Sequence, residues 1–359
     1  MHEIHESQLQ EEYKVNKISR RLLTGLLVAS VASLGLTGCA ASSVDACAVS
    51  DEGSWNDKSF NEAVMDGLMT AETDLEVSTA SAASATVADI PGNLQAMADQ
   101  GCKITFAVGF NGVDAVNAAA KANPGLNYVT VDGENKGSYA NLKPVNFKME
   151  QSSYLAGYLA AAYSKSHVVG TYGGMKIPAV TAFMDGFYYG AKKYEAESGV
   201  ATTVLGWNPV TKAGDFMDDF APNNAVGKAI AATQLQGGAD VLFPVGGNQY
   251  SALSEAITEA SAKAVMVGVD KDIALTSPEY KDMVLVSVEK RMANSTFEII
   301  KAASEGEKFD ATPYLGTLAN GGTGISPLYG FESMVDASVI TRLEELSAGI
   351  QDGSIDPLK

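Results

Sequence analysis

The sequence contains few of the side chains on which enzyme active sites and metal centres usually depend. Only three histidines and three cysteines occur among 359 residues. His2 and His5 precede an apolar leader that is expected to be removed, so only His167 remains in the body of the chain. A lone histidine removes Ser-His-Asp and Cys-His arrangements and any histidine-based metal site. The cysteines form no metal-binding cluster either, so no metal and no cofactor is expected.

Motifs that cradle phosphate groups are absent as well. The chain has no G-x-G-x-x-G and no G-x-x-x-x-G-K-S/T run, so dinucleotide and triphosphate sites have no support. The glycine-rich stretches 170–175 and 320–324 are expected to form tight loops instead. The net charge is −18, and phosphate backbones require clustered Lys and Arg. Nucleic acid is therefore not expected as a partner.

An apolar run near the N-terminus spans residues 22–36 and is too short for an ordinary membrane-spanning helix. It is preceded by Lys14, Lys17, Arg20 and Arg21. A basic stretch followed by a short apolar core is typical of a secretory signal. The run ends in Leu-Thr-Gly-Cys, which resembles the lipobox of bacterial lipoproteins and implies cleavage before Cys39 and acylation of its thiol. The adjacent arginines also suggest a twin-arginine signal, although general secretion is the default.

Two cysteines remain after Cys39. Cys47 lies early in an expected strand at 44–49, and Cys102 immediately precedes another expected strand at 103–108. If the strands follow a 2-1-3 order, these two are neighbours and a disulfide can form outside the cell. Two free buried thiols fit the sequence equally well.

After Ser43, short apolar stretches alternate with amphipathic ones. Strands are expected at 44–49, 75–79, 103–108, 126–131, 168–172, 200–206, 240–245, 264–269 and 284–288. Helices are expected at 60–73, 93–100, 112–121, 154–164, 180–198, 225–235, 251–261, 292–304 and 339–350. Such alternation predicts an α/β fold with βαβ units and parallel sheets. The helix at 154–164 is small and apolar nearly all round, so it should be buried.

An internal echo indicates two similar halves. The stretch 101–111, G-C-K-I-T-F-A-V-G-F-N, matches 238–248, G-A-D-V-L-F-P-V-G-G-N. Each copy is followed by a helix and then by a strand that ends in Val-Asp, at Asp132 and Asp270. Two α/β lobes of this kind place two sets of strand ends face to face across a cleft. The competing interpretation is that all βαβ units look alike.

The first candidate binding segment is the polar loop after the strand at 44–49. It offers an aromatic ring, an amide, a carboxylate and a cation, in Trp55, Asn56, Asp57 and Lys58. The following helix is expected to begin at Ser59 as N-cap, with Glu62 as capping-box partner. In open α/β sheets such loops lie at the carboxyl ends of the strands, where ligands bind. The alternative is an ordinary loop whose Asp and Asn serve only turn geometry.

Further candidates lie at other strand ends. Asp132 and Asp270 point to the same cleft, and Gly246 ends a strand where backbone can approach a ligand. Phe216 offers a ring in the segment before the helix at 225–235, and Lys290 follows the strand at 284–288. Acid–base catalysis by aspartates, such as nucleoside hydrolysis by Asp57, Asp132 and Asp270, stays open as an alternative. A dense aspartate cluster around calcium is absent, and no catalytic residue is predicted.

With these residues assembled, the chain resembles the basic membrane protein family of lipoproteins, the substrate-binding proteins of ABC importers. The resemblance runs from the lipobox to about residue 332. The motifs that carry it are D-K-S-F-N at 57–61, V-G-F at 108–110, Y-L-A-G-Y-L-A-A at 154–161, G-A-D-V at 238–241 and V-D at 269–270. The resemblance implies a type I periplasmic binding protein fold, with two Rossmann-like lobes joined by a hinge.

The resemblance also implies a division of the chain and a set of ligand contacts. The segments are a signal peptide (1–38), an N-terminal lobe (39–150, with later crossover segments), a C-terminal lobe (151–285) and shared crossover and closing segments (286–359). The implied ligand contacts are Asn56, Asp57, Met65, Asp132, Phe216, Gly246, Asp270 and Lys290. Phe216 would stack on the ligand base, and Met65 stands where the family commonly has an aromatic. Trp55 is an alternative source of the second ring.

The function that the resemblance implies is capture of a purine nucleoside by a lipid-anchored protein that faces outside the cytoplasm. The partners would be the nucleoside, an ABC permease and the membrane, which Cys39 would reach through its lipid. A receptor for a sugar or another small polar solute on the same fold is the alternative within this class. A receptor that signals, or a nucleoside-cleaving enzyme, is the alternative outside it.

Overall fold

A computed structural model describes residues 43–359. The predicted signal peptide and Cys39 lie outside these residues. Two six-stranded sheets and a two-stranded hairpin make up the strands of the described part. Each six-stranded sheet is covered by helices on both faces, so the predicted α/β class is confirmed.

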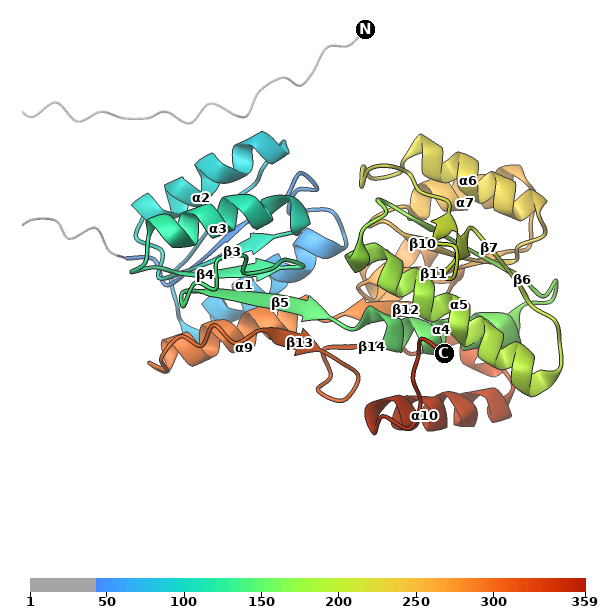
Figure 1. Cartoon of the computed structure of the whole chain (residues 1–359). Helices are drawn as coiled ribbons and strands as arrows, with labels where there is room; N and C mark the ends of the chain where they lie inside the picture. The colour runs from blue at the N-terminus through green and yellow to red at the C-terminus, as the bar shows by residue number, and fades with distance from the viewer. Residues whose placement is uncertain (1–42) are drawn as a thin grey trace, which may run out of the picture. The chain divides into compact units, whose positions relative to one another are not determined.

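The first sheet has the strand order β13-β5-β4-β3-β1-β2, and all of its strands are parallel. Its strands are β1 (Ala46–Val49), β2 (Thr79–Ala82), β3 (Ile104–Val108), β4 (Asn127–Val131), β5 (Leu142–Phe147) and β13 (Tyr314–Gly316). The helices are α1 (Phe60–Leu75), α2 (Ile90–Asp99), α3 (Val113–Ala122) and α9 (Met292–Ser304), with the 3-10 turns η1 (Val87–Asp89) and η2 (Phe110–Gly112). Helices α2 and α3 cover one face of the sheet, and α1 and α9 cover the other (Figure 1). We call this sheet with its helices the first lobe.

The second sheet has the order β14-β12-β11-β10-β6-β7, in which only β14 is antiparallel to its neighbour. Its strands are β6 (Val168–Gly173), β7 (Thr203–Leu205), β10 (Val241–Val245), β11 (Val265–Asp270), β12 (Val284–Lys290) and β14 (Thr323–Ile325). The hairpin strands are β8 (Trp207–Asn208) and β9 (Ala213–Gly214). The helices are α4 (Met149–Tyr163), α5 (Pro178–Ser198), α6 (Ala225–Gln236), α7 (Tyr250–Glu259), α8 (Ile273–Thr276) and α10 (Ala337–Gln351), with the turns η3 (Pro278–Tyr280) and η4 (Tyr329–Met334). We call these elements the second lobe.

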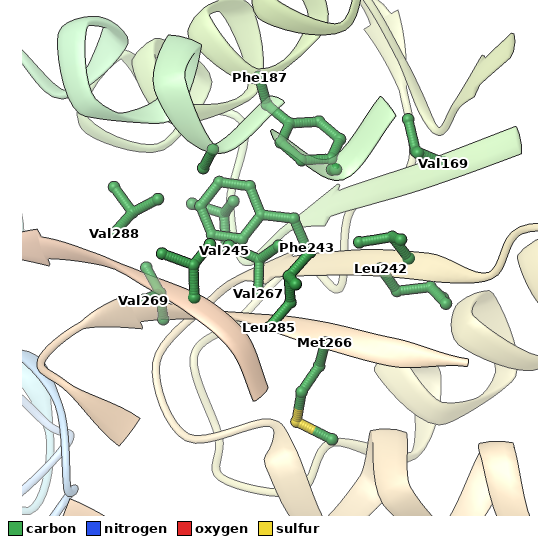
Figure 2. Close-up of a cluster of buried hydrophobic side chains, with 14 of the residues drawn as sticks. Val169, Phe187, Leu242, Phe243, Val245, Met266, Val267, Val269, Leu285 and Val288 are labelled. Atoms are coloured by element: carbon green, nitrogen blue, oxygen red, sulfur yellow. The ribbon is translucent and has the colours of Figure 1, made fainter. Parts of the chain in front are cut away.

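Burial of aliphatic and aromatic side chains holds the second sheet to its helices. Figure 2 shows Phe243 of β10 between Phe187 of α5 and the valines of the neighbouring strand β11, with Val288 of β12 to one side. The predicted burial of the helix at 154–164 is confirmed, although α4 begins at Met149. Glycines let α4 and α5 approach closely, because a Cβ at Gly157 or Gly190 would collide with the backbone of the other helix.

The internal echo is confirmed by the matching strand orders. The echoing stretches form β3 and β10, which occupy the same place in their sheets, and the following strands β4 and β11 do so too. The expected neighbourhood of the strands at 44–49 and 103–108 is also confirmed, because β1 pairs with β3. Cys47 and Cys102 form a disulfide whose Cα atoms lie 6.0 Å apart.

Several expected elements differ from the structure. The strand expected at 75–79 is β2 at Thr79–Ala82, because α1 continues to Leu75 and the chain turns at Glu76, whose φ is 53°. Strand β2 contains only Thr, Ala and Ser, so it has no apolar signal. Strand β5 was not expected, since Pro144 within it argues against a strand. Strands β13 and β14 have three residues each and lack a periodic pattern.

The late part of the chain contributes to both lobes. Helix α9 packs against α1 and β13 joins the first sheet, whereas β14 joins the second sheet and α10 packs against α4. The boundary predicted at residue 285 falls within β12.

Candidate functional site

The carboxyl ends of strands from both sheets surround one cavity. It encloses about 750 Å³ of space free of protein atoms, part of which is open to solvent at its mouth. The polar side chains that line it are Asp51, Asp57, Asn61, Asp132, Asn248, Asp270 and Lys290. The aromatic side chains that line it are Phe60, Phe110, Phe183 and Phe220. Rings combined with carboxylates suit a flat solute that carries hydrogen-bond donors.

Asp132 and Asp270 lie at equivalent ends of β4 and β11, and both line the cavity. Both have left-handed backbone, with φ of 55° and 65°. Aspartate tolerates this conformation better than most residues, because its short side chain bonds locally. The turn ends each strand and leaves its carboxylate beside the cavity, so the sequence brings these two residues together as predicted.

Asp270 is buried in the second lobe, and its main polar partner comes from the first. The Ser59 hydroxyl donates a hydrogen bond of 2.7 Å to its Oδ2. Burial raises the pKa of the Asp270 carboxyl to about 6, although Lys290 and the Ser59 hydroxyl favour the ionised form. A carboxylate with so little solvation gains strongly from further donors, such as ligand hydroxyls or ring N–H groups.

Lys290, at the end of β12, forms an ion pair with Asp132 across the two lobes. Its Nζ also lies 5.0 Å from the ring centroid of Phe60 and 5.6 Å from those of Phe147 and Phe183. The side chain is 3% exposed. The ammonium group is therefore held by charge and by aromatic faces, and it forms a fixed cationic point in the cavity wall.

Asp51 belongs to the cavity, although the sequence reasoning did not select it. It lies one residue beyond the end of β1, receives hydrogen bonds from the Gly53 amide and the Asn61 side chain, and lines the cavity. Burial raises its pKa to about 6. The available signal was its position, because Asp51 follows a strand end just as Asp132 and Asp270 do.

Asp57 lines the cavity, but both of its carboxylate oxygens already accept hydrogen bonds from residues at the start of its own helix. Its Oδ1 accepts from the amides of Ser59 and Glu62, and its Oδ2 accepts from the amide and side chain of Asn61. The expected N-cap function of Ser59 is wrong, because its hydroxyl bonds to Asp270 and not to the helix. Asp57 supplies the cap, which fixes the start of α1 and the direction of Phe60.

Asn56 and Met65 are not part of the cavity wall. Asn56 is exposed, and Met65 packs with Trp55 against the apolar core of the first lobe. The ring from this segment is Phe60, the first residue of α1, which lines the cavity. The motif D-K-S-F-N already contained it, but its direction depends on where the helix begins.

Phe216 does not line the cavity either. Its ring packs edge-on against Trp207, 5.8 Å between centroids, and covers Gly173, where a Cβ would lie 2.8 Å from the ring. The loop turns after this point, and Phe220 reaches the cavity instead. A ring in a loop cannot be assigned to a cavity from sequence, because loop direction follows no residue period.

Gly246 lines the cavity as predicted, and side chains behind its loop hold the loop in place. A Cβ at Gly246 would lie 2.3 Å from the terminal methyl group of Met217, so the methionine side chain would have to move to admit a larger residue. Gln249 is fully buried and donates to the carbonyls of Ala221, at 2.8 Å, and Gly246, at 3.1 Å. It also accepts from the Asn224 amide at 2.9 Å. One side chain therefore holds two cavity loops together.

Other features of residues 43–359 add no chemistry to this site. No group of three or more His, Cys, Asp or Glu in this part has an arrangement that would hold a metal ion. His167 is exposed at the start of β6. Within the same residues, no helix combines the length and apolarity needed to cross a membrane.

The family model for ABC transporter substrate-binding proteins of the PnrA-like type, named Bmp, matches residues 44–317. The chain belongs to this family. Among its curated relatives, the ABC transporter nucleoside-binding protein BmpA of Lactococcus lactis is 32% identical over 80% of this chain and 83% of its own length. Basic membrane protein D of Borreliella burgdorferi is 26% identical over 75% of each chain.

Solved structures agree with the fold of this Bmp family member. An ABC transporter solute-binding protein from Aeropyrum pernix K1 matches with a TM-score of 0.77 and 22% identity, covering 87% of this chain and 92% of that one. A solute-binding protein from Conexibacter woesei matches with a TM-score of 0.66 and 16% identity, covering 87% and 98%. The type I binding-protein fold is confirmed, and the chain is a substrate-binding protein of an ABC transporter.

Proposed function

We propose that this Bmp family protein captures purine nucleosides between its two lobes and releases them chemically unaltered to an ABC permease. The observation that carries the proposal is the composition of the cavity wall, which contains four aromatic rings and four carboxylates. A purine base is flat and apolar on its faces, and ribose presents hydroxyl donors. The nucleoside-binding name of the Lactococcus lactis relative supports the same ligand class.

Binding then follows from the chemistry of the wall. Rings such as Phe60 and Phe220 contribute roughly 0.5–1.5 kcal/mol per stacking contact beyond burial. Asp51 and Asp270 accept hydrogen bonds from ribose hydroxyls and from N–H groups of the base. An analogue that lacks one of these donors leaves a desolvated carboxylate unpaired, so selectivity comes from these contacts. Closure of the lobes around the ligand shifts the population toward one closed shape.

The same proposal places the mature protein outside the cytoplasm, anchored by lipid at Cys39. The lipobox-like sequence before Cys39 supports the anchor. The disulfide between Cys47 and Cys102 supports export, because structural disulfides persist mainly in oxidising compartments. A permease in the same membrane would receive the ligand.

Isothermal titration calorimetry with inosine, guanosine and adenosine tests the ligand class. At least one nucleoside is expected to bind, and Asp270→Ala is expected to weaken binding by more than tenfold, because Asp270 has no other ligand-facing substitute in β11. Ribose alone should bind far more weakly, since it offers no face for stacking. Tight ribose binding without nucleoside binding would favour the sugar-receptor alternative.

Incubation of the protein with nucleoside separates capture from cleavage. Chromatography should recover the intact nucleoside after prolonged contact, because the proposal contains no catalytic step. Release of free base in proportion to protein concentration would instead establish a nucleoside-cleaving enzyme.

A further inference from the structure

One face of α1 carries three polar side chains in helical register. Ser59 precedes the helix, and Glu62 and Asp66 follow at spacings of three and four residues. Residues at these spacings lie above one another on a helix. The helix belongs to the first lobe, and this polar stripe faces the end of β11 in the second lobe.

The dipeptide Asp270-Lys271 contacts this stripe. Asp270 accepts from the Ser59 hydroxyl, and the next residue, Lys271, donates from Nζ to Glu62 at 2.8 Å and to Asp66 at 2.6 Å. The Lys271 side chain is only 13% exposed, and that of Glu62 is 17% exposed. Lys271 is not part of the cavity wall. Its charge is therefore directed between the lobes and not to the ligand.

The directions of the pKa shifts of Lys271 and Glu62 agree with an ion pair between them. Burial disfavours the charged form of Lys271, but hydrogen bonds to Asp66 and Glu62 outweigh it and raise the Lys271 pKa. Burial likewise opposes ionisation of Glu62, yet the net effect of Lys271 and Lys58 is a lowered pKa. Lys271 and Glu62 therefore both remain charged near neutral pH.

We propose that Lys271 is a closure residue, whose ion pairs with Glu62 and Asp66 hold the lobes together around the ligand and so set the rate of ligand release. The inference rests on the proposed nucleoside function for its ligand, although the contact itself joins only protein groups. The closed form carries these bonds and an opened form loses them. Removing them lowers the closed fraction, and apparent affinity falls in proportion.

Lys271→Met tests the proposal because it keeps the length of the side chain and removes its charge. Stopped-flow binding of inosine is expected to show release accelerated roughly tenfold, with association changed less than about threefold, as is usual when a desolvated charge pair is broken. Lys58→Met is the matched control. Lys58 lies 3.6 Å from the same Glu62 but belongs to the same lobe, so its loss should leave release nearly unchanged.

Two further variants separate closure from general stability. Lys271→Arg keeps the charge and should release inosine at nearly the parent rate. The double charge exchange Lys271→Glu with Glu62→Lys should release more slowly than Lys271→Glu alone, because one interlobe pair is restored. Equal release rates for the parent and Lys271→Met, or equal effects of Lys271→Met and Lys58→Met, would overturn the proposal.

Small-angle X-ray scattering of the ligand-free proteins keeps this test independent of the ligand. Lys271→Met is expected to have a larger radius of gyration than the parent, because its closed fraction is lower, and Lys58→Met is not. If the parent binds no nucleoside, the proposed function fails, whereas the scattering comparison still decides the closure role. Identical scattering of parent and Lys271→Met would refute that role on its own.

Discussion

The two lobes share one strand order but place different chemistry on it. Five strands of each sheet are parallel in the same sequence of neighbours, and only the last strands differ, since β13 is parallel and β14 antiparallel. At the echo position before β3 the first lobe has Cys102, disulfide-bonded to Cys47, where the second lobe has Ala239. The repeated scaffold therefore determines where side chains emerge, and the individual residues determine what each lobe does.

Asp132 and Asp270 show the same difference at the cavity. They share position and backbone conformation, yet Asp132 is paired with Lys290, whereas Asp270 receives a hydroxyl and has a pKa raised to about 6 by burial. One carboxylate is already neutralised by the protein, and the other is left for the ligand. Equivalent strand ends thus divide into a structural pair and a binding group.

The largest expected effect that distinguishes the two aspartates is on stability. Asp132→Asn leaves Lys290 buried without its ion pair, and such losses cost about 3–5 kcal/mol. Asp270→Asn should not lower stability at pH 7, because a folded-state pKa above the unfolded value means that folding disfavours the charged form. Urea unfolding of both ligand-free variants measures the difference. Equal losses of unfolding free energy would show that the two sites are not divided in this way.

We expect the first lobe to depend on its disulfide for part of its stability. The bond closes a loop with a sequence separation of 55 residues, and removal of such a link typically costs about 2–4 kcal/mol. The double variant Cys47→Ala with Cys102→Ala should unfold at lower urea concentration. At position 102 it carries alanine, the residue that the second lobe has at the echo position. An unchanged midpoint under oxidising conditions would contradict this expectation.

Nucleoside binding should weaken on acidification, because ligand donors favour the ionised carboxylates. Asp51 and Asp270 both have a pKa of about 6 through burial, so the folded protein takes up their protons between about pH 7 and pH 5, whereas the unfolded chain stays ionised to lower pH. Affinity at pH 5 is expected to be roughly tenfold lower than at pH 7 for each such carboxyl that accepts from the ligand. Ligand-free stability should change in the opposite direction, increasing as pH falls through this window.

Titration calorimetry across this range with Asp270→Asn as the comparison identifies the group. The variant should lose the part of the pH dependence that belongs to Asp270 and keep the part that belongs to Asp51. A pH profile identical to that of the parent would show that Asp270 does not titrate with binding.

The smallest expected effect concerns the two rings of the second-lobe loop. Phe220→Leu removes a cavity ring and should weaken nucleoside binding by roughly 0.5–1.5 kcal/mol. Phe216→Leu, its matched control, should affect binding less and mainly weaken packing against Trp207 and Gly173. Calorimetry measures the nucleoside affinity of both variants. A larger loss of affinity for Phe216→Leu than for Phe220→Leu would identify Phe216 as the stacking ring.

The sequence predicted most of the sheet and helix framework because apolar periodicity is a local property. Asp132 and Asp270 were also predictable, since parallel strand ends meet at one edge of a sheet. The sequence did not predict β5, because Pro144 contradicts the usual strand pattern. It did not single out Asp51 either, although Asp51 lies close to a strand end like Asp132 and Asp270. Phe60 and Phe220 were not selected, because a helix start and a loop path decide their directions.

By itself, the sequence determined the duplicated α/β framework, the absence of histidine chemistry and the positions of the strand-end carboxylates. Only the tertiary structure decided that Asp57 caps α1, that Lys290 pairs with Asp132, and that Lys271 reaches Glu62 and Asp66 in the other lobe. The physical reason is range. Periodicity acts over a few neighbouring residues, whereas these polar partners are chosen by desolvation and distance between segments up to about two hundred residues apart.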